Sequence, residues 1–269
     1  MIRVFFVALF LGASLYSFAQ TDDSQTNLKT DRPNRTFSAF LVPKGAWQIE
    51  SGYAFTESYQ WIPLPSGGGY AGDFQFFQWT TQVRYGLSNK VELWFSQDLA
   101  KSRLMGGREL LGESDIEAFP TQLGLRVPLM KGKGLKPQIA LMGSVAGGPF
   151  TSADVGAVFD LRFNLYHQIT SKLSLGWNLI WQFDSDEDED GQAFSAVLGY
   201  QVFKRLSAFV EVWGPTPIFD GISPKAMNVG FIYTISPGLQ VDLSYGGNLT
   251  NTGLNELFAA GVAFRIPGK

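Results

Sequence analysis

The chain has 269 residues and a formal net charge of −3, and aromatic residues make up 14% of it. It has no cysteine, which excludes disulfides, thiol chemistry and a lipid-modified amino-terminal cysteine. The slightly acidic balance argues against nucleic acid as a partner. Mean hydropathy is +0.02, and together with abundant Phe and Gly this favours alternating strands over long apolar helices.

Residues 1–19 have the pattern of a secretory signal peptide. Arg3 is the only charged residue before the apolar run Val4–Leu15, and Ser17 and Ala19 give a small-x-small end. This arrangement predicts a leader that is cleaved after Ala19. The run is shorter than the about 20 apolar residues that a spanning helix needs. An uncleaved anchor is the alternative.

Residues 20–44 form a polar segment ahead of the first predicted strand. Pro33 and Pro43 keep it extended and outside regular strand pairing, and it contains the charged pair Asp31 and Arg32. Two interpretations are open. The segment is a flexible periplasmic leader, or it folds into the interior of the barrel predicted by the residues that follow, where Asp31 and Arg32 would meet inward-facing charges.

From residue 45 onwards the sequence alternates between apolar and polar side chains with a period of two. In the first stretch Trp47, Ile49 and Tyr53 share one face, and Gln48 and Glu50 share the other. This period predicts strands rather than helices. The predicted strands are 45–56, 76–85, 91–98, 119–127, 137–145, 155–166, 173–183, 192–203, 206–213, 225–235, 239–247 and 256–266.

Short and long connections alternate between these strands, which is typical of a membrane barrel with short periplasmic turns. We therefore predict an all-β fold, a transmembrane antiparallel up-and-down β-barrel of twelve strands over residues 45–266. It would lie in the outer membrane of a Gram-negative bacterium with both termini periplasmic. Ten or fourteen strands, or a soluble β-sandwich, are the alternatives, although aromatic residues near both strand ends favour membrane interfaces. The predicted loops are 57–73, 99–115, 147–154, 184–191, 214–224 and 248–255.

Inward-facing charges gather near the turns of the predicted strands. We expect them to form a ring at the periplasmic mouth of the barrel. The ring would either pair internally and fill the lumen, or select solutes as charged rings do in pores. Its members are Glu50, Arg84, Glu92, Arg126, Asp242 and Arg265.

Four aromatic residues, Phe76, Trp94, Phe209 and Trp213, fall on the inward face of their strands. They either fill space or provide a path for a hydrophobic or aromatic solute. Barrels of eight strands are filled by side chains and those of sixteen enclose a wide channel, so twelve is intermediate.

Metal and catalytic chemistry have weak signals. Asp186, Asp188 and Asp190 follow a calcium-loop spacing, but Val197 occupies the position of the bidentate Glu. We expect a solvated, divalent-binding surface loop and no cofactor. His167 is the only histidine, and it lies beside a predicted turn on the lipid-facing side. A serine hydrolase needs a Ser–His pair. Lipid substrate from the outer leaflet would arrive at the opposite side from His167, so we expect no enzyme.

Several stretches resemble the outer-membrane barrel family named after the meta-pathway of phenol degradation. The resemblance covers residues 30–266 and implies a barrel fold and an outer-membrane location; members of the family are often labelled as transporters. Gly124-Leu125-Arg126 has arginine where the family often has lysine. The matching stretches are Thr30–Pro33, Phe40–Gly45, Trp47–Tyr53, Ser114–Ile116, Glu211, Gln240–Asp242, Ser244–Gly246 and Gly261–Arg265.

The sequence thus predicts a channel or transporter for passive uptake or export of small solutes, hydrophobic or aromatic ones among them. A plugged, non-conducting structural or assembly-related barrel is the alternative. The expected partners are outer-membrane lipid and lipopolysaccharide, a small-molecule solute and the barrel-assembly machinery, which would recognise the chain through Phe264 and Ile266 near its end.

Overall fold

The computed structural model describes residues 28–63, 68–147, 157–184, 191–216, 225–249 and 254–268. The predicted signal peptide and the acidic stretch with Asp186, Asp188 and Asp190 lie outside these residues. Within the described part, helices long and apolar enough to cross a membrane are absent.

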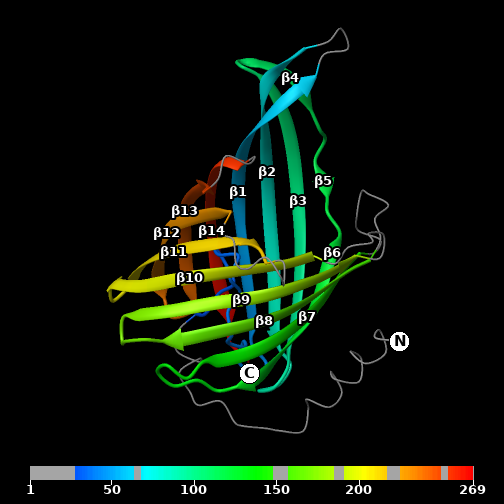
Figure 1. The fold of residues 1–269 in the computed structure, drawn as a ribbon. Helices are drawn as coiled ribbons and strands as arrows, with labels where there is room; N and C mark the ends of the chain where they lie inside the picture. Colours follow the sequence, from blue (N-terminus) through cyan, green and yellow to red (C-terminus); the bar gives the residue numbers. More distant parts are fainter. Residues whose placement is uncertain are drawn as a thin grey trace.

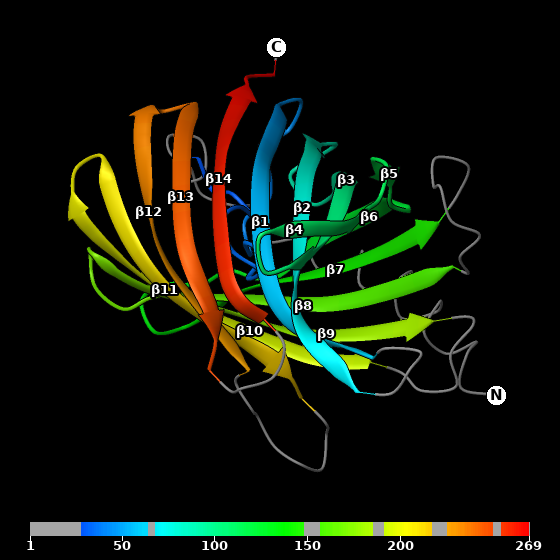
Figure 2. The ribbon, with the colours of Figure 1, turned by 90° about the horizontal axis from the view of Figure 1, so that it is seen from above.

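The described residues form an all-β, closed, antiparallel barrel of twelve strands, as the sequence predicted (Figures 1 and 2). Each wall strand pairs with its sequence neighbours, and pairing of β1 with β14 and of β2 with β3 closes the ring. The wall strands are β1 (Trp47–Pro63), β2 (Gly69–Gly86), β3 (Glu92–Gly106), β6 (Thr121–Met130), β7 (Gln138–Gly147), β8 (Val158–Gln168), β9 (Leu173–Asp184), β10 (Gly191–Phe203), β11 (Leu206–Pro215), β12 (Ala226–Ser236), β13 (Leu239–Asn248) and β14 (Leu254–Ile266).

The pairing register carries the polar face of the strands to the inside. Gln48 and Glu50 of β1 are fully buried, whereas Trp47, which faces the outside of the wall, is 46% exposed. Gln48 lies opposite Arg84 of β2 and opposite Arg265 of β14. Because side chains alternate between the two faces of a strand, this register lines the lumen with polar groups and leaves the apolar set outside.

Two of the predicted loops are wrong, because the structure extends the strands through most of them. β1 and β2 stay paired as far as Pro63 opposite Gly69, so residues 57–63 and 69–73 are strand. β3 continues to Gly106 and turns into β4 (Glu109–Glu113). Figure 1 shows these strands rising beyond the rest of the wall. In β1 the charged Glu57 interrupts the outward apolar face, which Tyr59 and Trp61 then continue, and this interruption is why the predicted strand stopped at residue 56.

Between β3 and β6 the wall contains a short irregular stretch. β6 pairs with β3 from Glu92 to Ser96, and the two-residue strand β5 (Glu117–Ala118) pairs with β3 farther along. Pro120 lies between β5 and β6 and has no backbone N–H to donate, which accounts for the interruption.

The N-terminal segment, defined here as residues 28–44, lies inside the barrel. Figure 2 shows it as the dark-blue trace within the ring of strands. Its side chains Asp31, Ala39, Leu41 and Val42 are at most 2% exposed. The segment leaves the lumen at Gly45, whose φ of 75° favours glycine, and enters β1 beside the end of β14.

Candidate functional site

The lumen near the short turns contains a buried cluster of charges. Arg84 of β2 lies between Glu50 of β1 and Glu92 of β3, with Nη1 3.0 Å from Glu50 Oε1 and Nε 2.9 Å from Glu92 Oε1. Arg126 of β6 is 3.4 Å from Glu92. All four side chains are 0% exposed. Four of the six predicted ring charges therefore meet on consecutive wall strands.

Asp31 of the N-terminal segment joins these four residues, and the five together are called the central ion cluster below. Asp31 Oδ2 is 2.6 Å from Arg126 Nη2, and Oδ1 is 3.6 Å from Arg84 Nη1. The backbone N–H groups of Asp31 and Arg32 both donate to Glu50 Oε2, at 2.8 and 2.9 Å. The cluster thus joins the segment to the wall through ion pairs and through hydrogen bonds to its backbone.

The other two predicted ring charges, Asp242 and Arg265, lie beside the cluster and have different partners. Asp242 is 3.6 Å from Arg32, the second charge that we singled out in the segment. Arg265 donates two hydrogen bonds to Gln48 Oε1, at 3.0 and 2.7 Å, and Gln48 donates to Glu50. The single ring expected from the sequence is therefore a central cluster with two attached pairs.

Two glycines make room for Arg32 at this wall. A Cβ on Gly52 of β1 would lie 2.1 Å from Arg32 Nη2, and a Cβ on Gly261 of β14 would lie 2.6 Å from Arg32 Nε. The guanidinium also donates to the carbonyl oxygen of Ala260 at 3.2 Å. The absence of side chains at Gly52 and Gly261 lets Arg32 lie flat against the strands.

The opposite wall holds the middle of the segment through Glu211 and Asn178, which were not among the predicted site residues. Glu211 of β11 accepts hydrogen bonds from the N–H and the hydroxyl of Thr36, both at 2.7 Å. Asn178 of β9 accepts from the N–H of Phe37 at 2.6 Å and donates to its carbonyl oxygen at 3.1 Å. Glu211 and Asn178 are polar residues on the inward face of their strands, and that parity was the available signal.

The rest of the segment also relies on wall side chains for its backbone hydrogen bonds. The N–H of Val42 donates to Glu92 at 2.6 Å, and the carbonyl oxygen of Phe40 accepts from Arg84 at 2.8 Å. Buried backbone groups need such partners. Here side chains supply them, so the segment is docked in the lumen without becoming a strand of the wall.

The predicted lumen aromatics divide into two groups. Trp94 is 3% exposed and its ring lies 5.8 Å from that of Phe37, while Arg35 lies over the ring of Trp213 at 5.1 Å. These two contact the N-terminal segment. Phe209 is buried against Gly230, and Phe76 packs edge-on against Phe119 at 6.1 Å.

The lone histidine is held by neighbours near a turn. His167 Nδ1 is 2.9 Å from the carbonyl oxygen of Leu135, and Trp177 Nε1 donates to His167 Nε2 at 3.2 Å. Across the described ranges, clusters of three or more His, Cys, Asp and Glu side chains able to hold a metal ion are absent.

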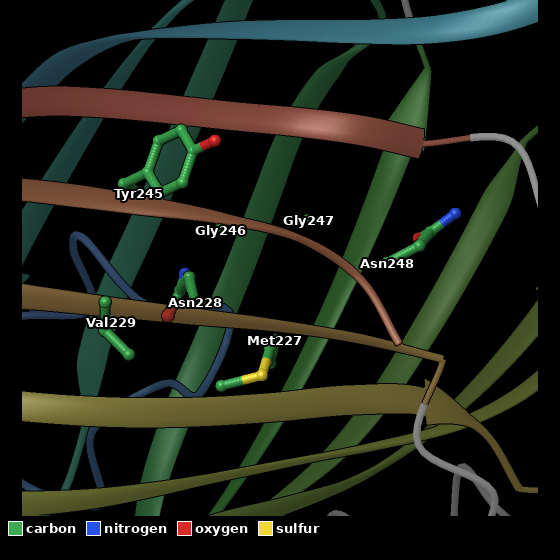
Figure 3. Close-up of a pocket in the computed structure, with 7 residues that line it drawn as sticks. All are labelled: Met227, Asn228, Val229, Tyr245, Gly246, Gly247 and Asn248. Carbon is green, nitrogen blue, oxygen red and sulfur yellow. The ribbon is translucent and has the colours of Figure 1, made fainter. Parts of the chain in front are cut away.

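A hollow of about 290 Å³ lies between β12 and β13, away from the central ion cluster (Figure 3). Gly246 and Gly247 contribute no side chains to its lining, and Asn228 and Tyr245 flank it. Its lining residues are Met227, Asn228, Val229, Tyr245, Gly246, Gly247 and Asn248.

A closed barrel with a polar interior and an aromatic-rich exterior defines the class of outer-membrane β-barrels. Within this class, residues 30–266 match the family model described as "Putative MetA-pathway of phenol degradation", and the chain belongs to that family. No curated protein sequence matches the chain.

Solved structures share the fold at low sequence identity. The COG4313 outer membrane channel from Pseudomonas putida F1 is similar with a TM-score of 0.62 and 12% identity, over 92% of this chain and 100% of that one. The NanC porin is similar with a TM-score of 0.50 and 9% identity, over 82% and 100% of the two chains. At these identities the likeness establishes the fold alone.

Proposed function

We propose that the protein is a passive channel in the outer membrane of a Gram-negative bacterium, for small solutes that include hydrophobic and aromatic ones. The short turns and both termini face the periplasm. Membership of the family and the closed barrel support a membrane channel. Lipid and lipopolysaccharide surround the wall, and the barrel-assembly machinery inserts it through its last strand. The chain has no catalytic role.

The observation that carries this proposal is how the N-terminal segment is docked. Its backbone is held by side chains such as Glu50, Glu211 and Asn178, whereas the wall strands are held by continuous pairing with one another. The segment can therefore shift without any wall strand losing its neighbours. A barrel built this way can change from closed to open while it stays folded.

Aromatic surface beneath the segment suggests the class of solute. Trp94 and Trp213 are covered by Phe37 and Arg35 of the segment. When the segment shifts, these rings become available to whatever occupies the lumen. Flat apolar faces beside inward-facing polar groups suit aromatic acids and similar solutes, since a ring can stack while a polar group keeps a hydrogen-bond partner.

A swelling assay in proteoliposomes tests the proposal, with arabinose, benzoate and phenylacetate as solutes. The full chain should admit the aromatic acids faster than the sugar. A deletion of residues 28–42 should admit all three faster and with less discrimination. Deletion of residues 20–27 is the control, because it removes polar chain and leaves the described segment in place.

A non-conducting structural barrel is the second candidate, and the complete burial of the central ion cluster favours it. Planar-bilayer recordings separate the two. If the full chain shows no conductance, and the deletion of residues 28–42 shows none while still folded by its heat-dependent mobility on gels, the barrel is not a channel.

A further inference from the structure

Of the five short turns at one end of the barrel, four carry basic residues, and none of the five contains Asp or Glu. The turns 86–91, 131–137, 169–172 and 203–205 connect β2 to β3, β6 to β7, β8 to β9 and β10 to β11. None of these four turns contains Asp or Glu. Their exposed cations are Lys90, Lys133, Lys136, Lys172, Lys204 and Arg205.

Each of the same four turns also exposes a large apolar side chain. Leu135 is 73% exposed and Phe203 is 69% exposed, and Leu87 and Ile169 occupy the corresponding places in the other two turns. An apolar side chain next to a basic one is the combination found where a protein surface rests in a membrane interface, because the apolar group enters the acyl region while the cation stays among the headgroups.

The turns are fixed in position rather than independent of one another. The carbonyl oxygen of Lys172 accepts from the N–H of Gln201, and that of Arg205 accepts from the N–H of Thr234, both at 2.8 Å. The carbonyl oxygen of Leu135 is 2.9 Å from His167 Nδ1. These contacts link three of the four turns to an adjacent strand, and Gly86 at the start of the fourth exchanges backbone hydrogen bonds with Gly45 and Ala46.

The other end of the barrel has a different charge pattern. On the β3–β4 hairpin Lys101 and Arg103 both pair with Glu113, each at 2.7 Å, and Glu109 lies on the same strand as Glu113. Mixed signs at that end show that basic character is a property of the turn rim and not of the exposed surface in general.

We propose that the turn rim binds anionic phospholipid of the periplasmic leaflet. The lysines and Arg205 contact lipid phosphates, and Leu87, Leu135, Ile169 and Phe203 enter the acyl region beneath them. Clustered basic side chains are attracted to anionic membrane surfaces in this way. The exposed apolar partners favour lipid over the carboxylates of peptidoglycan, which would engage the cations alone. This inference rests on the proposed orientation and requires no transport activity.

The test measures the unfolding midpoint of the full chain by its heat-dependent mobility on gels, in two kinds of vesicle. Both consist mainly of phosphatidylethanolamine, with either phosphatidylglycerol or phosphatidylcholine as the minor lipid. We expect a midpoint several degrees higher with phosphatidylglycerol, and we expect added salt to reduce the difference, because exposed charges are screened.

A triple variant, Lys133→Gln, Lys136→Gln and Lys172→Gln, should lose at least half of that difference. The matched control, Lys101→Gln, Arg103→Gln and Arg108→Gln at the opposite end, should keep it. Equal midpoints in the two lipids, or equal losses in the two variants, would overturn the proposal. If the triple variant no longer co-sediments with purified peptidoglycan but keeps the stability difference between the two lipids, the lysines bind the cell-wall polymer and the proposal is overturned. None of these measurements depends on solute flux, so failure of the lipid-binding proposal can be distinguished from failure of the channel proposal.

Discussion

Two parts of the molecule place one carboxylate between two cations, one inside the lumen and one outside. In the lumen Asp31 lies 2.6 Å from Arg126 and 3.6 Å from Arg84, and the three side chains are 0% exposed. On the outer hairpin Glu113 lies 2.7 Å from both Lys101 and Arg103, with side chains between 31% and 43% exposed. Each carboxylate contacts two cations, although the inner arginines also contact Glu50 and Glu92, and the surroundings of the two groups are opposite.

This contrast teaches that burial decides what such a triad does. Water screens the outer triad, and exposed pairs of this kind contribute little to stability. The inner triad is fully buried, so removal of Asp31 takes from Arg126 its shortest ion pair and leaves it with Glu92 at 3.4 Å, in surroundings where a lost partner costs more than at the surface. We therefore expect the inner triad to control the position of the N-terminal segment, and the outer one to leave the fold nearly unchanged when altered.

Removal of the inner carboxylate should have the largest effect. Asp31→Ala leaves Arg126 and Arg84 without one of their carboxylates, and breaking a buried pair costs about 3–5 kcal/mol. The segment should then leave its docked position. The chain has no cysteine, so Ala39→Cys provides a single label, and its reaction with a membrane-impermeant maleimide in the folded barrel should accelerate in the Asp31→Ala background. An unchanged labelling rate would show that the ion pairs do not hold the segment.

The neutral contact on the opposite wall should come next. Asn178→Ala removes both hydrogen bonds to Phe37, and an unsatisfied buried polar group costs about 1–3 kcal/mol. Labelling at Ala39→Cys should accelerate, but less than with Asp31→Ala. Asn164→Ala is the matched control, since Asn164 is equally buried and faces Asn178 across the strand pair, but its amide makes no hydrogen bond to the described part of the segment. Equal effects of the two asparagine variants would assign the change to packing.

Crowding of Arg32 should give an effect of similar or smaller size. Gly52→Ala places a methyl group 2.1 Å from Arg32 Nη2 and 2.6 Å from the carbonyl oxygen of Ala260, and overpacking of this kind costs about 1–3 kcal/mol. The unfolding midpoint should fall. Gly112→Ala on β4 is the control, because its added Cβ meets nothing within 4 Å. Similar shifts in both variants would mean that strand propensity, rather than Arg32, is responsible.

The wall of the barrel was predictable because its signal is local. Trp47, Gln48 and Ile49 alternate in sequence as they alternate in space, and a register follows once twelve such strands are paired. The extension of β1 beyond residue 56 was missed because Glu57 interrupts the apolar face, although Tyr59 and Trp61 continue it. There the sequence Glu57 to Trp61 reads as a loop although it is paired.

Only part of how the N-terminal segment is docked could be predicted from the sequence. Asp31 and Arg32 were singled out as a charged pair, but the contact of Asp31 with Arg126 spans 95 residues and no periodic pattern marks it. Pro33 and Pro43 exclude the segment from strand pairing, but they do not indicate whether it lies in the periplasm or in the lumen. Glu211 and Asn178 were on the inward face, yet only the path of the segment shows why those two, among many inward polar residues, contact it.

The outer triad should give the smallest effect. Hydrogen bonds from Lys101 and then Arg103 hold the pKa of Glu113 below its ordinary value. A lowered pKa in the folded state means that any stabilisation is present above the ordinary pKa and is lost only as the pH falls through the lowered one. At neutral pH Glu113→Gln should therefore leave the unfolding midpoint unchanged within error, and a difference from the parent chain should not grow as the pH is raised. The midpoints of Glu113→Gln and Asp31→Ala are compared in the same vesicles. If Glu113→Gln destabilises the barrel as much as Asp31→Ala, burial is not what distinguishes the two triads, and the β3–β4 hairpin must be coupled to the wall as tightly as the lumen is.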